Sequence, residues 1–132
     1  MNRFYPFVAV RARGRCEYCR APEEVTNGVF AVDHIHSESL GGANEYDNFA
    51  LASFTYNGYK SDFVTGIDPE TDTEARLFHP RRDTWNEHFA VDDTNHVAGL
   101  TDVGRATIAR LNLNHDRQIK ARAFWRGSGI FP

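Results

Sequence analysis

The sequence contains only two cysteines and no long run of apolar residues. Cys16 and Cys19 are separated by two residues, and one such pair does not make the disulfide framework of a small secreted domain. A membrane-spanning helix needs about 20 consecutive apolar residues, and no run here approaches that length. Residues 1–15 place arginines after the apolar positions and lack a small-residue cleavage site, so no signal peptide is expected. These absences predict a cytoplasmic protein without a membrane partner.

The chain also has little net charge, −3 at pH 7, but the charge is unevenly distributed. Residues 1–20 contain five arginines and one glutamate, whereas residues 21–75 contain eleven acidic residues and one lysine. Residues 76–132 are basic again, with nine basic and six acidic residues. Nucleic-acid binding depends on local basic patches that displace counterions, so the small net charge neither excludes nor establishes such a partner.

A length of 132 residues fits a single domain, and the residue patterns predict an α+β fold. The N-terminal half is expected to contain a helix within 3–14, a turn at Asn27-Gly28, a strand over 29–35, a glycine-containing loop over 36–47 and a helix over 48–62. The C-terminal half is expected to begin with an acidic turn after Gly66, a strand over 76–85 broken by Pro80, and two strands around Asp92-Asp93. Two helices are expected to follow. The first covers 101–113 and is capped by Thr101 or Asp102, and the second is a basic helix over 114–126.

Residues able to hold a metal and activate water are concentrated between Val32 and Lys60. The oxygens of Asp33 and Asn57 are hard ligands of the kind that suits Mg²⁺. Histidine titrates near neutral pH, so His34 is suited to act as a general base on a water molecule. Lys60 shares a helix face with Asn57, and asparagines commonly tie loops by bonding to the backbone, which is the role expected for Asn48.

These residues stand in the order of the HNH endonuclease motif, which the chain resembles. The motif consists of a cysteine pair, an acid–histidine pair, two glycines, an asparagine before an apolar stretch, and Asn-x-x-Lys. The segment from Leu77 to Arg122 is also similar to the C-terminal half of small bacterial stand-alone HNH proteins, so the resemblance covers about 11–122. It implies a ββα-metal finger, with its core at about 14–62, inside a single domain of residues 1–132 that adds a β-hairpin and C-terminal helices.

The resemblance also implies a function, which is metal-dependent hydrolysis of phosphodiester bonds in DNA. On this reading Asp33 and Asn57 hold the divalent ion, most commonly Mg²⁺, with Mn²⁺ or another divalent ion as alternatives. His34 acts as the general base, and Asn48 orients the loop that carries it. Lys60 either meets phosphate or supports the helix.

The sequence departs from many relatives at the second cysteine pair of a four-cysteine zinc site. Ser53 and Tyr56 stand at those positions. Cys16 and Cys19 provide two of the four ligands that a closed zinc site needs, and nothing in the spacing requires His36 as a third. We therefore expect no structural Zn²⁺.

The same residues also have other interpretations. Taken singly, Asp33 and His34 are more typical of a turn residue and of a structural histidine. The chain could also be a non-catalytic nucleic-acid-binding module on a degenerate HNH fold. Arginines that could contact phosphate, or form structural ion pairs instead, are Arg81, Arg82 and Arg105. The sequence does not indicate a homodimer, although it leaves one open.

Overall fold

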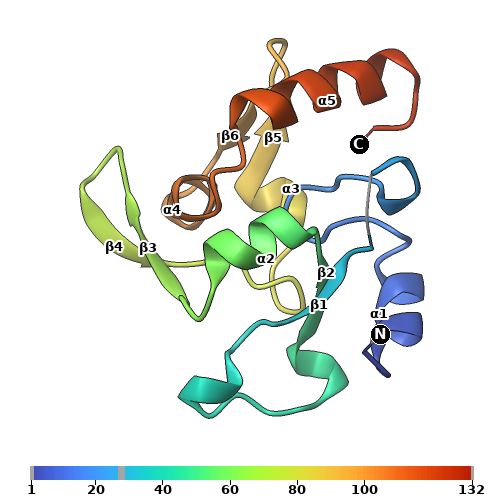
Figure 1. The fold of residues 1–132 in the computed structure, drawn as a ribbon. Coiled ribbons are helices and arrows are strands. Elements are labelled where there is room, and N and C mark those ends of the chain that lie inside the picture. Colours follow the sequence, from blue (N-terminus) through green and yellow to red (C-terminus); the bar gives the residue numbers. More distant parts are fainter. Residues whose placement is uncertain (1, 27–28, 132) are drawn as a thin grey trace.

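The computed structural model describes residues 2–26 and 29–131, and it shows a small mixed α+β fold (Figure 1). Its helices are α1 (Tyr5–Arg11), α2 (Phe54–Lys60), α3 (Trp85–His88), α4 (Asp102–Leu111) and α5 (Asp116–Gly127). Its strands are β1 (Ala31–His34), β2 (Phe49–Ala52), β3 (Thr65–Asp68), β4 (Thr73–Arg76), β5 (Phe89–Val91) and β6 (Val97–Gly99). None of the helices in the described part of the chain has the length and apolar character needed to cross a membrane.

The strands form three separate antiparallel hairpins, β1–β2, β3–β4 and β5–β6. In the first hairpin Ala31 pairs with Ala52 and His34 pairs with Phe49. All four residues of β2 are buried, and both α1 and α2 pack near this hairpin. The succession β1, β2, α2 therefore forms a compact ββα unit (Figure 1).

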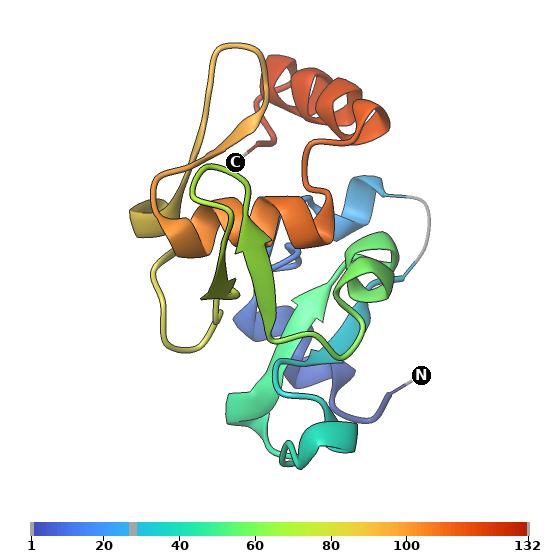
Figure 2. The same cartoon turned by 90° about the vertical axis from the view of Figure 1, so that its left-hand side faces the viewer.

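Helix α4 connects this unit to the rest of the molecule. It packs against β3, β4, β6 and α2, and Figure 2 shows it crossing the molecule behind the β3–β4 hairpin, with α5 above it. Apolar residues from both ends of the chain, Val8 and Phe131 included, belong to one buried cluster. The ββα unit thus rests on a core shared with the C-terminal helices.

Several elements agree with the sequence-based expectations. The predicted N-terminal helix corresponds to α1, the predicted strand before the loop to β1, and the predicted strand pair to β5–β6. The two predicted C-terminal helices correspond to α4 and α5. The N-cap of α4 is Thr101, whose hydroxyl accepts a hydrogen bond from the backbone N–H of Gly104 at 3.0 Å. The turn expected at Asn27-Gly28 lies outside the described residues.

Two expectations for secondary structure are wrong. The helix predicted over 48–62 is a strand, β2, followed by α2, because Ser53 caps a helix that begins only at Phe54. Apolar residues in a short buried strand can mimic helical spacing, and only the pairing of β2 with β1 separates the two cases. The strand predicted over 76–85 ends at Arg76, and the acidic turn before it joins β3 to β4 as a hairpin.

Gly104 in α4 provides a test of this packing. A Cβ atom at Gly104 would overlap the carbonyl oxygen of His88, whereas a Cβ at Gly127 in α5 would meet nothing within 4 Å. Gly104→Ala is expected to lower the free energy of unfolding by about 1–3 kcal/mol through overpacking. Gly127→Ala should be neutral or stabilise by less than about 1 kcal/mol, because alanine favours helix. Equal urea midpoints for the two variants would contradict this close approach of α4 to α3.

Candidate functional site

The end of β1 directs two neighbouring side chains in opposite directions. Asp33 points into the protein and is 4% exposed, whereas the side chain of His34 is 21% exposed. This division follows from strand geometry, since successive side chains project to opposite faces. The two residues therefore have different environments although they are adjacent in sequence.

Asp33 lies in a buried network with a tyrosine and a lysine. Its Oδ2 atom accepts a hydrogen bond from the Tyr18 hydroxyl at 2.7 Å. The Lys60 Nζ atom lies 3.3 Å from Oδ2 and 3.4 Å from Oδ1 of Asp33, and it also donates to the His34 carbonyl oxygen at 3.1 Å. Burial raises the pKa of Asp33, and the Lys60 ammonium and the Tyr18 hydroxyl offset part of this effect. Lys60 is only 2% exposed, so its ammonium contacts the end of β1 from the interior of the protein.

His34 faces the loop that follows β1. Its Nε2 atom lies 3.0 Å from a carboxylate oxygen of Glu38 and 3.1 Å from the Asn44 side-chain oxygen. A carboxylate can only accept, so in a neutral ring this geometry assigns the proton to Nε2 and leaves the lone pair on Nδ1. The ring also packs edge-on against Phe49, with the ring centroids 5.0 Å apart. His34 is thus oriented from two sides, and Nδ1 is the atom able to accept a proton.

Asn48 ties together the loop after β1. Its Oδ1 atom accepts from the His36 N–H at 2.8 Å, and its Nδ2 group donates to the carbonyl oxygens of His36 and Ala43 at 2.9 and 2.8 Å. The glycine pair serves the same loop. Gly41 has a φ of +90°, and a Cβ at Gly42 would collide with the backbone of His36. These bonds hold the loop whose Glu38 and Asn44 contact His34.

Asn57 lies in the middle of α2, one turn before Lys60. The sequence places it late in a longer helix over 48–62, which is wrong because α2 begins only at Phe54. It is half-buried, and within residues 2–26 and 29–131 no hydrogen bond to its side chain is found. The helix turn that places Lys60 beneath Asp33 therefore also brings Asn57 to the same side of α2.

The residue types present fit a hard divalent ion. Asp33 supplies a carboxylate and Asn57 an amide oxygen, and Mg²⁺ commonly binds through one or two such groups plus water and phosphate. Oδ1 of Asp33 has a second lone pair besides the one used by Lys60, whereas Oδ2 is contacted by both the Tyr18 hydroxyl and Lys60. A metal ion at Asp33 would compete electrostatically with the ammonium of Lys60. Within the described residues, no group of three or more His, Cys, Asp or Glu side chains is arranged to hold a metal.

The four positions that correspond to the cysteine site of many HNH proteins are brought together. Cys16 and Cys19 are free thiols and fully buried. Burial opposes ionisation of Cys16, but a hydrogen bond with Cys19 and the backbone N–H of Ser53 hold its pKa below the ordinary value. Burial raises the pKa of Tyr56, and the adjacent Cys19 and Cys16 add to the increase. Two hydroxyl groups thus occupy the places of the second thiol pair.

The three arginines predicted to contact nucleic acid have different environments. Arg105 makes two 2.9 Å bonds to the buried Asp68 carboxylate, and this pairing holds the pKa of Asp68 well below its usual range. Arg81 forms an ion pair with Glu17. Arg82 is exposed and lines a cleft. Only Arg82 of the three therefore presents a guanidinium that no described carboxylate holds.

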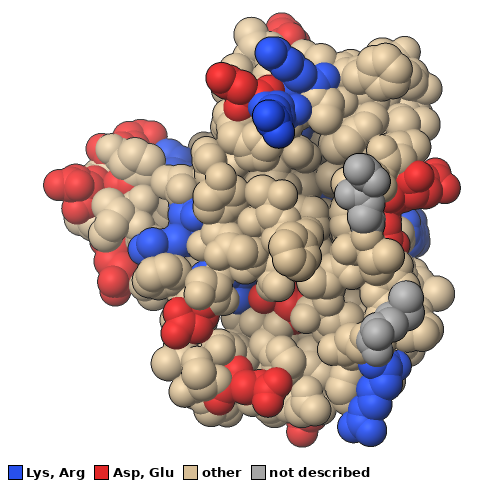
Figure 3. Space-filling view, viewed as in Figure 1, with Lys and Arg blue, Asp and Glu red and all other residues tan. Residues whose placement is uncertain are grey.

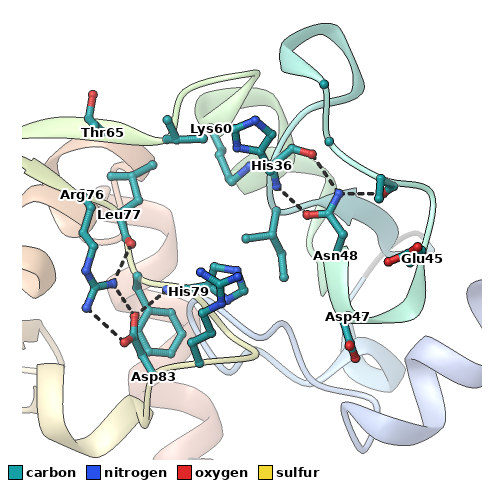
Figure 4. Close-up of a pocket in the computed structure, with 17 residues that line it drawn as sticks. His36, Glu45, Asp47, Asn48, Lys60, Thr65, Arg76, Leu77, His79 and Asp83 are labelled. Atoms are coloured by element: carbon teal, nitrogen blue, oxygen red, sulfur yellow. Dashed lines mark hydrogen bonds and ion pairs between the residues drawn. The ribbon is translucent and has the colours of Figure 1, made fainter.

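That cleft has a volume of about 800 Å³ and lies between the loop after β1 and the segment 76–83. In Figure 4 His36 projects from one wall and His79 from the other, with Asn48 beside His36. Burial lowers the pKa of His79, and the nearby Arg82 adds to this effect. The sequence did not single out His79, because its position opposite His36 depends on the tertiary fold. His34 does not line the cleft.

Lys60→Met tests the buried ion pair, because it removes the ammonium while keeping an apolar side chain of similar length. The free energy of unfolding is expected to fall by about 3–5 kcal/mol, since the buried Asp33 carboxylate loses its partner. The pKa of Asp33 is already raised by burial, so protonation relieves the cost at low pH. The deficit should therefore be smallest in acid and grow as the pH rises through the pKa of Asp33, as measured by urea unfolding across a pH series.

Two further variants serve as controls for this prediction. Asp33→Asn combined with Lys60→Met removes both charges and should be less destabilised than the sum of the single variants. Lys120→Met changes an exposed lysine of α5 and should have little effect. A Lys60→Met deficit that is independent of pH would contradict the ion pair.

The cysteine positions give a second test. Native mass spectrometry of protein refolded with equimolar Zn²⁺ is expected to show the mass of the apoprotein, because Ser53 and Tyr56 do not complete a closed zinc site. The Ser53→Cys/Tyr56→Cys variant supplies four adjacent thiols and should retain one Zn²⁺ and unfold at higher temperature when zinc is present. Stoichiometric zinc in the wild-type protein that is lost on Cys16→Ser would overturn the expectation.

Residues 16–55 match the family model described as HNH endonuclease. No curated protein and no solved structure matches the chain. The matched segment contains Cys16, Asp33, His34 and Asn48, and it ends just before Asn57.

Proposed function

Because residues 16–55 carry an HNH endonuclease domain, we propose that the protein is a metal-dependent endonuclease that hydrolyses phosphodiester bonds in DNA. The observation that supports this function most directly is the environment of His34. Its Nε2 atom lies 3.0 Å from Glu38, so that in the neutral ring Nδ1 carries the lone pair, at a partly exposed site next to Asp33. A histidine held in this way is arranged to take a proton from water.

In this proposal His34 is the general base, and Glu38 and Asn44 fix the orientation of its ring. Proton transfer to a positioned base typically contributes about 10²–10⁴-fold to the rate. Asn48 acts through the loop, since its three bonds to backbone groups position Glu38 and Asn44 relative to β1. Lys60 supports the end of β1 through its bonds to Asp33 and to the His34 carbonyl oxygen.

Asp33 and Asn57 are the residues that would hold the divalent ion, which we infer to be Mg²⁺, with Mn²⁺ or another divalent ion as substitutes. When bound, such an ion stabilises negative charge on the phosphate oxygens and on the leaving oxygen. We further infer that the ββα unit is a ββα-metal finger with its core at about 14–62, within a single domain of residues 1–132.

A second candidate function is a nucleic-acid-binding module without catalysis. The observation that favours it is the position of the Lys60 ammonium, which lies 3.3 and 3.4 Å from the two oxygens of Asp33. Lys60 therefore already supplies the positive charge that a metal ion would bring to this carboxylate. In that case DNA would bind with strong salt dependence and no strand would be cut. The orientation of His34 makes the enzyme the better supported of the two.

A plasmid-nicking assay tests the proposal. Supercoiled DNA is incubated with the wild-type protein in Mg²⁺, in Mn²⁺ or in excess chelator, and beside the variants His34→Ala, His36→Ala and His96→Ala. Nicking is expected to require the metal and to fall about 10²–10⁴-fold in His34→Ala, as loss of a general base predicts. His96→Ala makes the same replacement in the β5–β6 turn and should leave the rate unchanged.

His36→Ala decides between the two histidines near the loop. His36 lines the cleft, whereas His34 does not, so a large loss in His36→Ala together with an active His34→Ala would move the base to His36. Intact plasmid with folded wild-type protein in every metal, combined with salt-dependent binding, would favour the binding module.

A further inference from the structure

A second hollow, with a volume of about 440 Å³, adjoins the cleft at the segment Phe78–Asp83. It is formed by the end of α1, the turn that follows it and residues near α3. The residues of the hollow that carry positive charge are Arg11, Arg13, Arg15 and Arg20. We refer to these four side chains as the arginine cluster.

The positive charge of the arginine cluster is not neutralised locally. Two acids line the hollow, but Glu17 pairs with Arg81, and Asp83 accepts two bonds from Arg76 at 2.6 and 3.1 Å. In the part of the chain that the structure describes, no carboxylate lies within 4 Å of a guanidinium of the cluster. An excess of cationic charge therefore faces the hollow.

Two members of the cluster are already used for structure. Arg11 donates to the carbonyl oxygens of Tyr46 and Phe49, and Arg15 donates to those of Arg20 and Ile130. These bonds fix the guanidinium groups in place without cancelling their charge. The hollow thus has two rigid cations in its wall.

The other two members have no hydrogen-bond acceptor among the described residues and sit on unusual backbone. Arg13 and Arg20 have φ values of 56° and 65°, in the left-handed region that residues other than glycine seldom adopt. The Arg20 guanidinium lies over the Trp85 ring, 4.5 Å from its centroid. Burial lowers the pKa of Arg20, and the nearby Arg15 lowers it further, as expected where like charges crowd together. A bound anion would relieve this repulsion.

The hollow adjoins the cleft, which Asn48 and Lys60 of the candidate site also line. Phe78 and Asp83 line both the hollow and the cleft, and Arg82 also lines the cleft. By contrast, acidic side chains gather over the β3–β4 hairpin at the left edge of the face shown in Figure 3. A polyanion that reaches the cleft therefore meets repulsion toward that hairpin and attraction toward the arginine cluster.

We propose that the arginine cluster binds phosphate groups of a nucleic-acid backbone and so anchors the strand beside the cleft. The inference rests on the proposed function, because it assigns the anchor to the same substrate. Arg13 and Arg20 contact phosphate oxygens, whereas Arg11 and Arg15 contribute fixed positive charge. Guanidinium groups suit this ligand because their donors match two phosphate oxygens at once.

The test is a binding titration that does not depend on cleavage. A fluorescent duplex is titrated by anisotropy in chelator, over a series of salt concentrations, with wild-type protein and with Arg13→Gln/Arg20→Gln. Each phosphate contact contributes about 0.9 to the slope of log K against log salt, so the slope should fall by about 2 in the double variant. Arg117→Gln/Lys120→Gln removes two exposed cations from α5 and should leave the slope unchanged.

Two further measurements show whether a lower slope comes from lost phosphate contacts. Arg13→Lys/Arg20→Lys keeps both positive charges and should restore most of the slope. Unfolding of the glutamine variant would not account for that recovery. In a Trp125→Phe background, Trp85 is the remaining one of two tryptophans, and its fluorescence should change when DNA binds, because Arg20 stacks on it. The same emission is recorded with inorganic pyrophosphate in place of DNA.

Each outcome has a defined meaning. Equal slopes for wild-type protein and Arg13→Gln/Arg20→Gln, or equal losses in the α5 control, would overturn the proposal. Saturable binding of pyrophosphate with no change in the DNA slope would assign the hollow to a free anion and would also overturn it. The nuclease assignment is judged separately by metal-dependent nicking and its loss in His34→Ala, so either conclusion can fail while the other stands.

Discussion

The buried ion pair between Asp33 and Lys60 is the contact on which the arrangement of the candidate site depends. It joins the end of β1 to the last turn of α2, and the same lysine holds the carbonyl oxygen of His34. Placing both charges out of water costs free energy that their attraction and the Tyr18 hydroxyl offset only with good geometry. The position of His34 is therefore coupled to the packing of α2, and any change in that packing alters the base as well as Asp33.

The parts of the fold that were predicted correctly are those whose signals are local. Thr101 and the apolar spacing after it identify α4, because an N-cap and a helical period lie within a dozen residues. The strand β2 was predicted as helix, because its apolar residues are compatible with either structure until the partner strand is known. The pairing of Asp33 with Lys60 and the position of His79 opposite His36 depend on segments far apart in sequence, so no local pattern reveals them.

The fold places the acidic and basic segments of the chain on different parts of the surface. The acidic residues of the middle segment include those of the β3–β4 hairpin, and the basic N-terminal residues line a hollow beside the cleft. A net charge of −3 is therefore compatible with a polyanionic substrate, because local fields decide where such a ligand approaches. Arg13 and Arg20, which direct positive charge into the hollow, both have a positive φ, a backbone conformation that is unfavourable for residues other than glycine.

Analysis of the ends produced on a labelled DNA duplex tests the central claim most directly. If water attacks phosphorus and the 3′-oxygen is the leaving group, cleavage in Mg²⁺ should leave a 5′-phosphate and a 3′-hydroxyl, and a ligase should rejoin the products without prior repair. Ends that carry a 3′-phosphate, or cleavage that continues in excess chelator, would contradict the account. A 3′-phosphate would mean that the 5′-oxygen leaves instead, and cleavage in chelator would mean that no divalent ion takes part.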